Sequence, residues 1–180
     1  MERLEASTIV YASPERVYKF LLDFPSYTRY SKYLRTVRSD GDGGPGTEYE
    51  MDFSWWKLTY TAASRVTGVD PPSRIDWTIT KHIDADGAWR IEPVDPDDPA
   101  VDPDLYDGAV ARAIFEVSYD AENARLGRID LPRFVSADWV IRKVKPLVTE
   151  EAERVVRRAV RDLEDRDRSV AVEIAGPVET

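Results

Sequence analysis

The sequence predicts an α+β fold in which a curved antiparallel sheet of about seven strands wraps around a long C-terminal helix, with two short helices after the first strand. Three observations predict this class. Short runs of alternating apolar and polar residues, separated by turns, fill most of residues 34–119. A short helical pattern precedes them, and a long amphipathic pattern follows them. Because the chain offers no other large apolar partner, the long helix must bury its stripe against the sheet.

The first strand and the short helices come at the start of the chain. Residues 2–11 alternate and contain strand-forming side chains. Ser13 and Pro14 then suit the N-cap and first position of a helix, because proline lacks an N–H that is not needed there. Pro25 ends this helix, since the residue before a proline avoids the α region. A second helical turn is predicted over residues 26–30.

The remaining strands are joined by turns rich in glycine, proline and aspartate, which favours an antiparallel meander. The clearest alternation predicts one buried and one solvated face for its strand. The segment Asp84–Gly87 is a hairpin signal. The predicted strands cover residues 34–38, 47–55 (the clearest alternation), 56–69, 74–83, 88–91 and 108–119.

The long helix is predicted in two parts. Ser136 is the expected N-cap of residues 137–145, and Pro146 is expected to interrupt and kink the run. In the second part, acidic residues come first and arginines later, as the helix dipole favours. Its apolar stripe is predicted to comprise Val148, Ala152, Val155, Ala159 and Leu163.

The length of 180 residues suits one domain with a substantial core, predicted over residues 1–168, followed by a tail over residues 169–180. Within the domain, residues 92–107 hold four prolines and seven acids and cannot pack as a regular element. We expect an exposed acidic, proline-rich loop there. It is either a lid over a pocket or a solvated insertion, and the insertion is favoured.

The composition excludes several classes of function. The 34 acidic residues exceed the 25 basic ones and give a net charge of −9, which would repel the phosphates of a nucleic acid. The absence of cysteine excludes disulfides, thiolate catalysis and thiolate metal sites. With one histidine and no nucleotide-binding or nucleophile-elbow motif, neither a metal nor a cofactor is expected.

The sequence also bears on location. No run of about 18 apolar residues is present, so no helix is expected to span a membrane. Residues 1–5 are charged and lack the apolar core of a signal peptide, so a cytoplasmic location is expected. Only six of the 25 basic residues are lysine. This acidic, lysine-poor composition favours a halophilic protein, with an ordinary acidic protein as the alternative. The oligomeric state is left open.

Residues 13–25, with the sequence SPERVYKFLLDFP, resemble the N-terminal signature of the START-like helix-grip (SRPBCC) superfamily. The cluster Tyr27, Tyr30 and Tyr33 and the helix segment Glu151–Val155 are similar to the polyketide cyclase/dehydrase branch; the coenzyme Q-binding proteins are another branch of this superfamily. The resemblance covers residues 2–165 and implies a helix-grip fold. It does not distinguish carriers, receptors and enzymes, all of which this superfamily contains. The loop 92–107 is longer than the family plan.

A single helix cannot fill the hollow of a curled sheet, so we expect apolar space between them. The strand over residues 47–55 would supply one wall, the strand over residues 74–83 another, and the long helix a third. For any single aromatic side chain, ordinary core packing is the favoured role, whereas the aromatic residues as a group could line a ligand cavity. The residues expected to bind a ligand are Tyr49, Met51, Phe53, Trp55, Ile75, Trp77, Ile79, Val148, Ala152, Val155 and Ala159.

Three polar residues are candidates for assisting chemistry. His82, the only histidine, is either a surface residue or a general acid/base near the pocket mouth. Arg112 is exposed if it follows strand parity, but an inward orientation would let it hold a ligand carboxylate or enolate. Tyr60 is the third candidate.

Three functions remain open at this point. The first is binding or carriage of a hydrophobic small molecule such as a polyketide, a quinone or an isoprenoid-like lipid. The second is a polyketide cyclase/dehydrase-type enzyme, which would act by folding a reactive chain in a shaped pocket. The third is a protein-interaction module of the same fold, which would expose an apolar patch.

Overall fold

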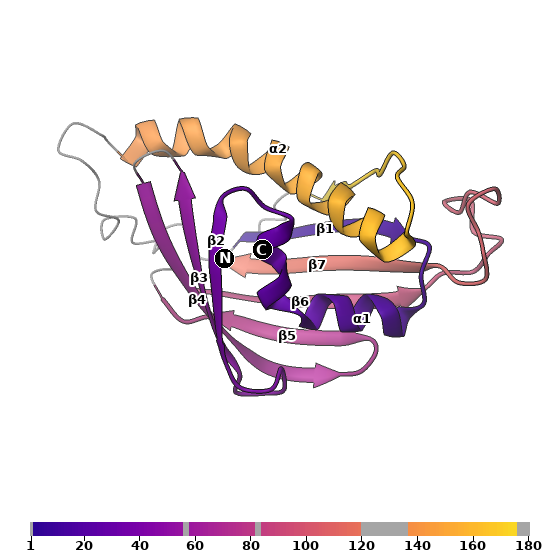
Figure 1. The fold of residues 1–180 in the computed structure, drawn as a ribbon, viewed down its shortest axis with the longest axis horizontal. Coiled ribbons are helices and arrows are strands. Elements are labelled where there is room, and N and C mark those ends of the chain that lie inside the picture. The colour runs from indigo at the N-terminus through magenta and orange to yellow at the C-terminus, as the bar shows by residue number, and fades with distance from the viewer. Residues whose placement is uncertain (1, 56–57, 82–83, 120–136, 176–180) are drawn as a thin grey trace.

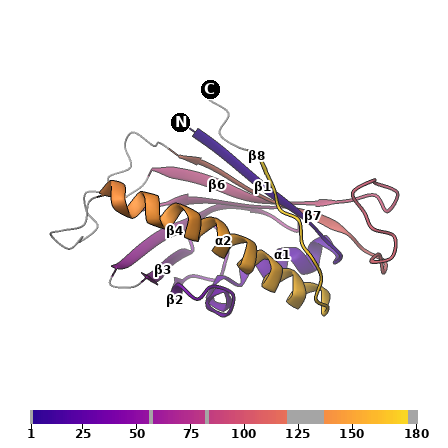
Figure 2. The ribbon, with the colours of Figure 1, turned by 90° about the horizontal axis from the view of Figure 1, so that it is seen from above.

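In a computed structural model, one large sheet curves around a long helix, and a shorter helix lies on the same concave side (Figures 1 and 2). The structure describes residues 2–55, 58–81, 84–119 and 137–175, with the backbone alone described for residues 2, 58 and 137–149. Within these residues, no helix combines the length and the apolar character that crossing a membrane requires.

The element order matches the α+β fold class that the sequence predicts, including the two short helices after the first strand. The elements are β1 (Glu2–Val10), α1 (Pro14–Leu22), the 3-10 helix η1 (Phe24–Arg29), β2 (Leu34–Asp40), β3 (Glu48–Trp55), β4 (Leu58–Asp70), β5 (Arg74–Ile79), β6 (Ala85–Pro93), β7 (Ala111–Tyr119), α2 (Ala137–Glu164) and β8 (Glu173–Ala175). As expected, Ser13 caps α1, because its side chain accepts a hydrogen bond from the Arg16 N–H.

The strand order is β2-β3-β4-β5-β6-β7-β1-β8, and all neighbours are antiparallel. Strands β2 to β7 therefore form an antiparallel meander, β1 adds to it beside β7, and β8 pairs with β1 at the edge. The sheet does not close on itself in the described part of the chain. The eighth strand, β8, lies in the stretch that the sequence predicts as a tail. It has three residues, too few to show an alternating pattern.

The inner face of the sheet is filled at one end. There α1 and the last turns of α2 pack against β1, β5, β6 and β7, and the side chain of Ile75 is completely buried. The buried cluster at this end, which we call the closed end, comprises Val10, Ala12, Val17, Tyr18, Leu21, Tyr49, Val66, Ile75, Ile91, Ala111, Val160 and Leu163.

A buried carboxylate fastens the C-terminal end of α2 to the sheet. The side chain of Glu164 is 0% exposed and accepts hydrogen bonds from the Tyr11 N–H at 2.9 Å and from Arg168 at 2.7 Å. Arg168 also donates to the Ile9 carbonyl at 2.8 Å, while Arg166 contacts Glu164 at 3.3 Å and donates to the Leu105 carbonyl at 2.5 Å. Helix α2, β1 and the loop before β7 therefore share one network.

A second buried acid fastens the middle of α2 to the segment before β2. Glu151 accepts hydrogen bonds from the Ser31 hydroxyl and the Lys32 N–H, each at 2.9 Å, and from Arg154 at 2.5 Å. Burial alone would raise the pKa of Glu151, but these donors outweigh it and lower the pKa. The carboxylate therefore stays charged and sets the rotation of α2 about its own axis.

Two local predictions were wrong. The segment Asp84–Gly87 is not a hairpin turn, because Ala85 to Gly87 belong to β6. Helix α2 is continuous across Pro146, since losing one backbone hydrogen bond does not end a helix held on both sides by further turns.

Candidate functional site

The inner face is less completely covered at its other end. The N-terminal turns of α2 pass over this end, where β3 finishes and β4 begins (Figures 1 and 2). Large apolar side chains here are only partly buried. This open end comprises Met51, Phe53, Trp55, Tyr60, Trp77, Ile79, Phe115 and Val117.

Strand register places these side chains on one face, because directly paired residues point to the same side of a sheet. Met51 pairs with Ala62, and Phe53 pairs with Tyr60. Trp77 pairs with Val66 on one side and with Gly87 on the other. Since Val66 belongs to the buried core, its row faces inward. None of the described inner-face side chains of β3 to β7 is charged.

Three aromatic rings form the centre of this surface. The indole of Trp77 stacks on Phe115 with ring centroids 5.6 Å apart, and Trp89 packs on the same phenyl ring at 4.9 Å. To reach Phe115, the indole lies across β6 at Gly87, where an added Cβ would meet its ring at 2.2 Å. Gly87 is thus required inside a strand, which explains why the sequence pattern was mistaken for a turn.

Of the two candidate catalytic residues that the structure describes, Tyr60 lies on this face. Burial raises the pKa of its hydroxyl, so the group stays protonated at neutral pH and can donate a hydrogen bond. Arg112 lies on the outer face instead, where it pairs with Ile9 and Glu92 in the sheet and contacts Glu173 at 3.5 Å. His82 lies outside the described residues.

The residues that the sequence predicts as the helical wall of the site differ in how deeply they are buried. Val155 and Ala159 are half-buried, whereas Ala152 is exposed. Val160 is more deeply buried than any residue of the predicted stripe, and Val156, one position after Val155, also packs against the core. The side chain of Val148 lies outside the described part. On β3 and β5, Tyr49 and Ile75 are buried in the closed end, and the other expected ligand-binding residues belong to the open end.

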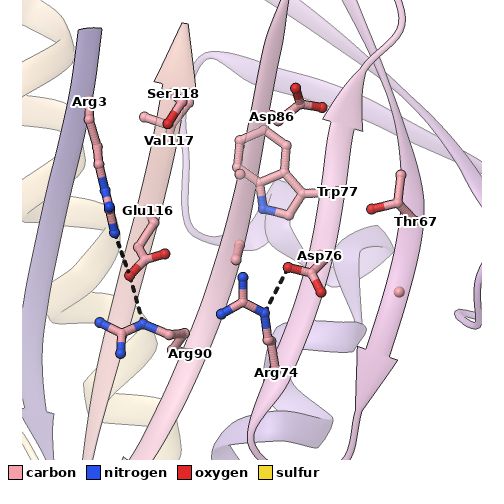
Figure 3. Close-up of a pocket in the computed structure, with 13 residues that line it drawn as sticks. Arg3, Thr67, Arg74, Asp76, Trp77, Asp86, Arg90, Glu116, Val117 and Ser118 are labelled. Carbon is pink, nitrogen blue, oxygen red and sulfur yellow. Dashed lines mark hydrogen bonds and ion pairs between the residues drawn. The ribbon is translucent and has the colours of Figure 1, made fainter. Parts of the chain in front are cut away.

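The outer face carries a separate, open hollow of about 730 Å³, shown in Figure 3. Its cations are already paired with its carboxylates. Arg3 and Arg90 both contact Glu116, at 3.2 and 2.7 Å, and Arg74 contacts Asp76 at 2.8 Å. This hollow is polar and opens on the outer face of the sheet, although Trp77, Gly87 and Val117 of the inner-face rows also contribute to its lining.

The acidic loop lies away from the open end. It protrudes beyond the end of the sheet where β6 finishes and β7 begins (Figure 1). The loop has a small core of its own, in which Val101 packs with Tyr11 and Val110. Its placement gives no support to a role as a lid over the open end.

The rest of the described surface offers few other sites. Tyr106 and Ile174 are the exposed large hydrophobic residues in this part of the chain. Within the described ranges, no three histidine or acidic side chains gather as metal ligands. The aromatic open end is therefore the strongest candidate site on geometric grounds.

A known protein family matches most of this chain. A family model described as "Polyketide cyclase / dehydrase and lipid transport" matches residues 1–160. A search of curated protein sequences found no match.

Several solved structures have the same fold. The Zhui aromatase/cyclase from Streptomyces sp. R1128 superposes with a TM-score of 0.64 at 14% identity, covering 93% of this chain and 96% of that one. A START superfamily protein from Mycobacterium smegmatis gives a TM-score of 0.57 at 15% identity, covering 91% and 99%. Norcoclaurine synthase from Thalictrum flavum, solved with a transition-state analogue, gives 0.56 at 13% identity, covering 91% and 94%.

Proposed function

The chain belongs to the polyketide cyclase/dehydrase and lipid transport family, and we propose that it binds a hydrophobic small molecule between the open end of its sheet and α2. The molecule would be a polyketide, a quinone or an isoprenoid-like lipid. No cofactor or metal enters this proposal.

One observation carries the proposal: large apolar side chains at the open end remain partly exposed although α2 crosses that side of the sheet. Removing apolar surface from water contributes about 0.8 kcal/mol per methylene, so a ligand with about ten methylenes gains about 8 kcal/mol before the costs of association. Those costs are several kcal/mol, which leads us to expect micromolar affinity.

Filling the open end should weaken binding. Ala6 lies on β1 directly opposite Phe115 and is partly exposed, so Ala6→Leu adds apolar atoms beside the aromatic surface. Losing room for about two methylenes should reduce the affinity for a neutral probe about tenfold. Fluorescence titration with N-phenyl-1-naphthylamine measures this, since the probe brightens in apolar surroundings.

The matched control is Ser7→Leu, which puts the same side chain on the next residue of β1, opposite Ile114. Because strand neighbours point to opposite faces, this variant should bind the probe as the unaltered protein does. Equal weakening by both variants, or by neither, would count against a site on the inner face.

A polyketide cyclase/dehydrase-type enzyme is the second candidate function. It is favoured by the protonated hydroxyl of Tyr60 on the same face as Trp77 and Phe115, because a positioned proton donor can assist an aldol closure or a dehydration. A carrier returns its ligand unchanged, whereas an enzyme returns a cyclised or dehydrated product. A protein-interaction role has little support, because the exposed large hydrophobic residues of the described part are two scattered ones.

A further inference from the structure

We infer that the indole N–H of Trp77 is the donor that orients the ligand, and that the ligand therefore presents a neutral acceptor oxygen, such as a ketone, beside a flat apolar body. This inference rests on the proposed function, because it concerns the same open end of the sheet.

The starting observation is an unpaired polar atom. Nε1 of Trp77 is buried and has no hydrogen-bond partner. Only one other described side-chain nitrogen shares this condition, Arg90 Nε, and it lies 2.7 Å from the carboxylate of Glu116. Buried donors in native proteins are nearly always paired, so an unpaired one requires an explanation.

The indole is positioned by its packing and by no hydrogen bond among the described residues. It rests over Gly87, which has no side chain, and stacks on Phe115 at 5.6 Å. Figure 3 shows the ring extending from β5 across β6. Since Nε1 has no hydrogen-bond partner among the described residues, no hydrogen bond opposes a tilt of the ring away from β6. Trp77 is only partly buried as a residue, and a ligand at the open end would reach its N–H once the ring tilts.

The surroundings specify the kind of acceptor. The described inner-face side chains of β3 to β7 include no cation, so these strands offer no counter-charge to a carboxylate or phosphate. A ketone or quinone oxygen satisfies the indole N–H at a much smaller desolvation cost. The flat body of such a ligand can stack beside Phe115 and Trp89.

Two probes of equal shape test the inference: 2-acetylnaphthalene, which has a ketone oxygen, and 2-isopropenylnaphthalene, which has a methylene group in its place. The unaltered protein should bind the ketone about 3- to 10-fold more tightly, the usual effect of one net hydrogen bond. Trp77→Phe keeps an aromatic ring but removes the N–H, so the ratio of the two affinities should fall to about 1. Trp89→Phe, the same change on the neighbouring strand, removes part of a ring that the ligand stacks beside and should weaken both probes alike, but it keeps the Trp77 N–H, so the ratio should stay unchanged.

A second measurement uses the unaltered protein, so that it does not depend on how well a variant folds. The indole N–H resonance of Trp77 should move downfield when the ketone is added and not when the alkene is added. Equal affinity for both probes, or a ratio that survives Trp77→Phe, would overturn the inference and leave the proposed function standing. Binding of neither probe would remove both.

Discussion

Glu164→Ala is expected to destabilise the protein by about 3–5 kcal/mol, the usual cost of removing one partner from a buried ion pair. The Glu164 side chain is 0% exposed and joins Arg168, Arg166 and the Tyr11 N–H. Without the carboxylate, the largely buried Arg168 guanidinium keeps the Ser169 and Ile9 carbonyls and the Tyr11 ring as partners but loses its counter-charge from Glu164. Urea unfolding of the variant and the unaltered protein measures the loss.

Glu153→Ala is the matched control, because Glu153 is exposed on the same helix, and its effect should be within about 0.5 kcal/mol.

The network around Glu164 also predicts that the protein loses stability in acid. Burial tends to raise the pKa of Glu164, but hydrogen bonds from Arg168 and the Tyr11 N–H outweigh it and lower the pKa. Stability from a lowered carboxyl pKa is complete above the ordinary glutamate value of about 4.3 and is lost as the pH falls through the lowered pKa. As the pH falls below about 4.3, the Glu164→Ala variant should therefore lose less unfolding free energy than the unaltered protein. Equal losses in the two proteins would contradict this account.

Ile75→Ala should destabilise the protein by about 2–5 kcal/mol, while Ile79→Ala should cost about 1 kcal/mol. Both residues are isoleucines on the inner face of β5, four positions apart. Ile75 is 0% exposed in the closed end, so its truncation leaves a cavity. Ile79 is partly exposed at the open end, where solvent already reaches it. Thermal and urea unfolding compare the two variants.

Ligand binding should follow the reverse order. Ile79→Ala removes part of the proposed site and should weaken the binding of N-phenyl-1-naphthylamine, whereas Ile75→Ala should leave it nearly unchanged. If the two variants lose equal stability, the interior is equally packed at both ends. That result would contradict the division into a closed and an open end.

The sequence was sufficient for the strand meander, because apolar and polar residues alternate along β3 and β5, as a strand with two unlike faces requires. It was insufficient for Gly87. Glycine after aspartate is typical of turns, and only the distant contact between Trp77 and Phe115 explains a glycine within β6. The short strand β8 has no pattern of its own and depends on pairing with β1.

The buried face of α2 is a second feature that the sequence alone did not predict correctly. Two apolar stripes, offset by one residue, run along α2: one contains Val155 and Ala159, the other Val156 and Val160. The second is the more deeply buried at Val160. Which stripe faces the sheet depends on the rotation of α2 about its own axis. That rotation is fixed by the hydrogen-bond partners of Glu151 and Glu164. Acidic residues on an amphipathic helix are usually solvated, so the sequence contained no sign that these two are buried.

The central claim is that the open end of the sheet holds an apolar ligand under α2. The most direct test is a crystal structure of the protein with 6-bromo-2-acetylnaphthalene, whose bromine is located by its anomalous scattering. The account predicts an anomalous peak on the inner face in contact with the Trp77 and Phe115 side chains. A bromine found only in the outer-face hollow beside Arg74, or an interior closed by the protein's own side chains with no peak, would contradict it.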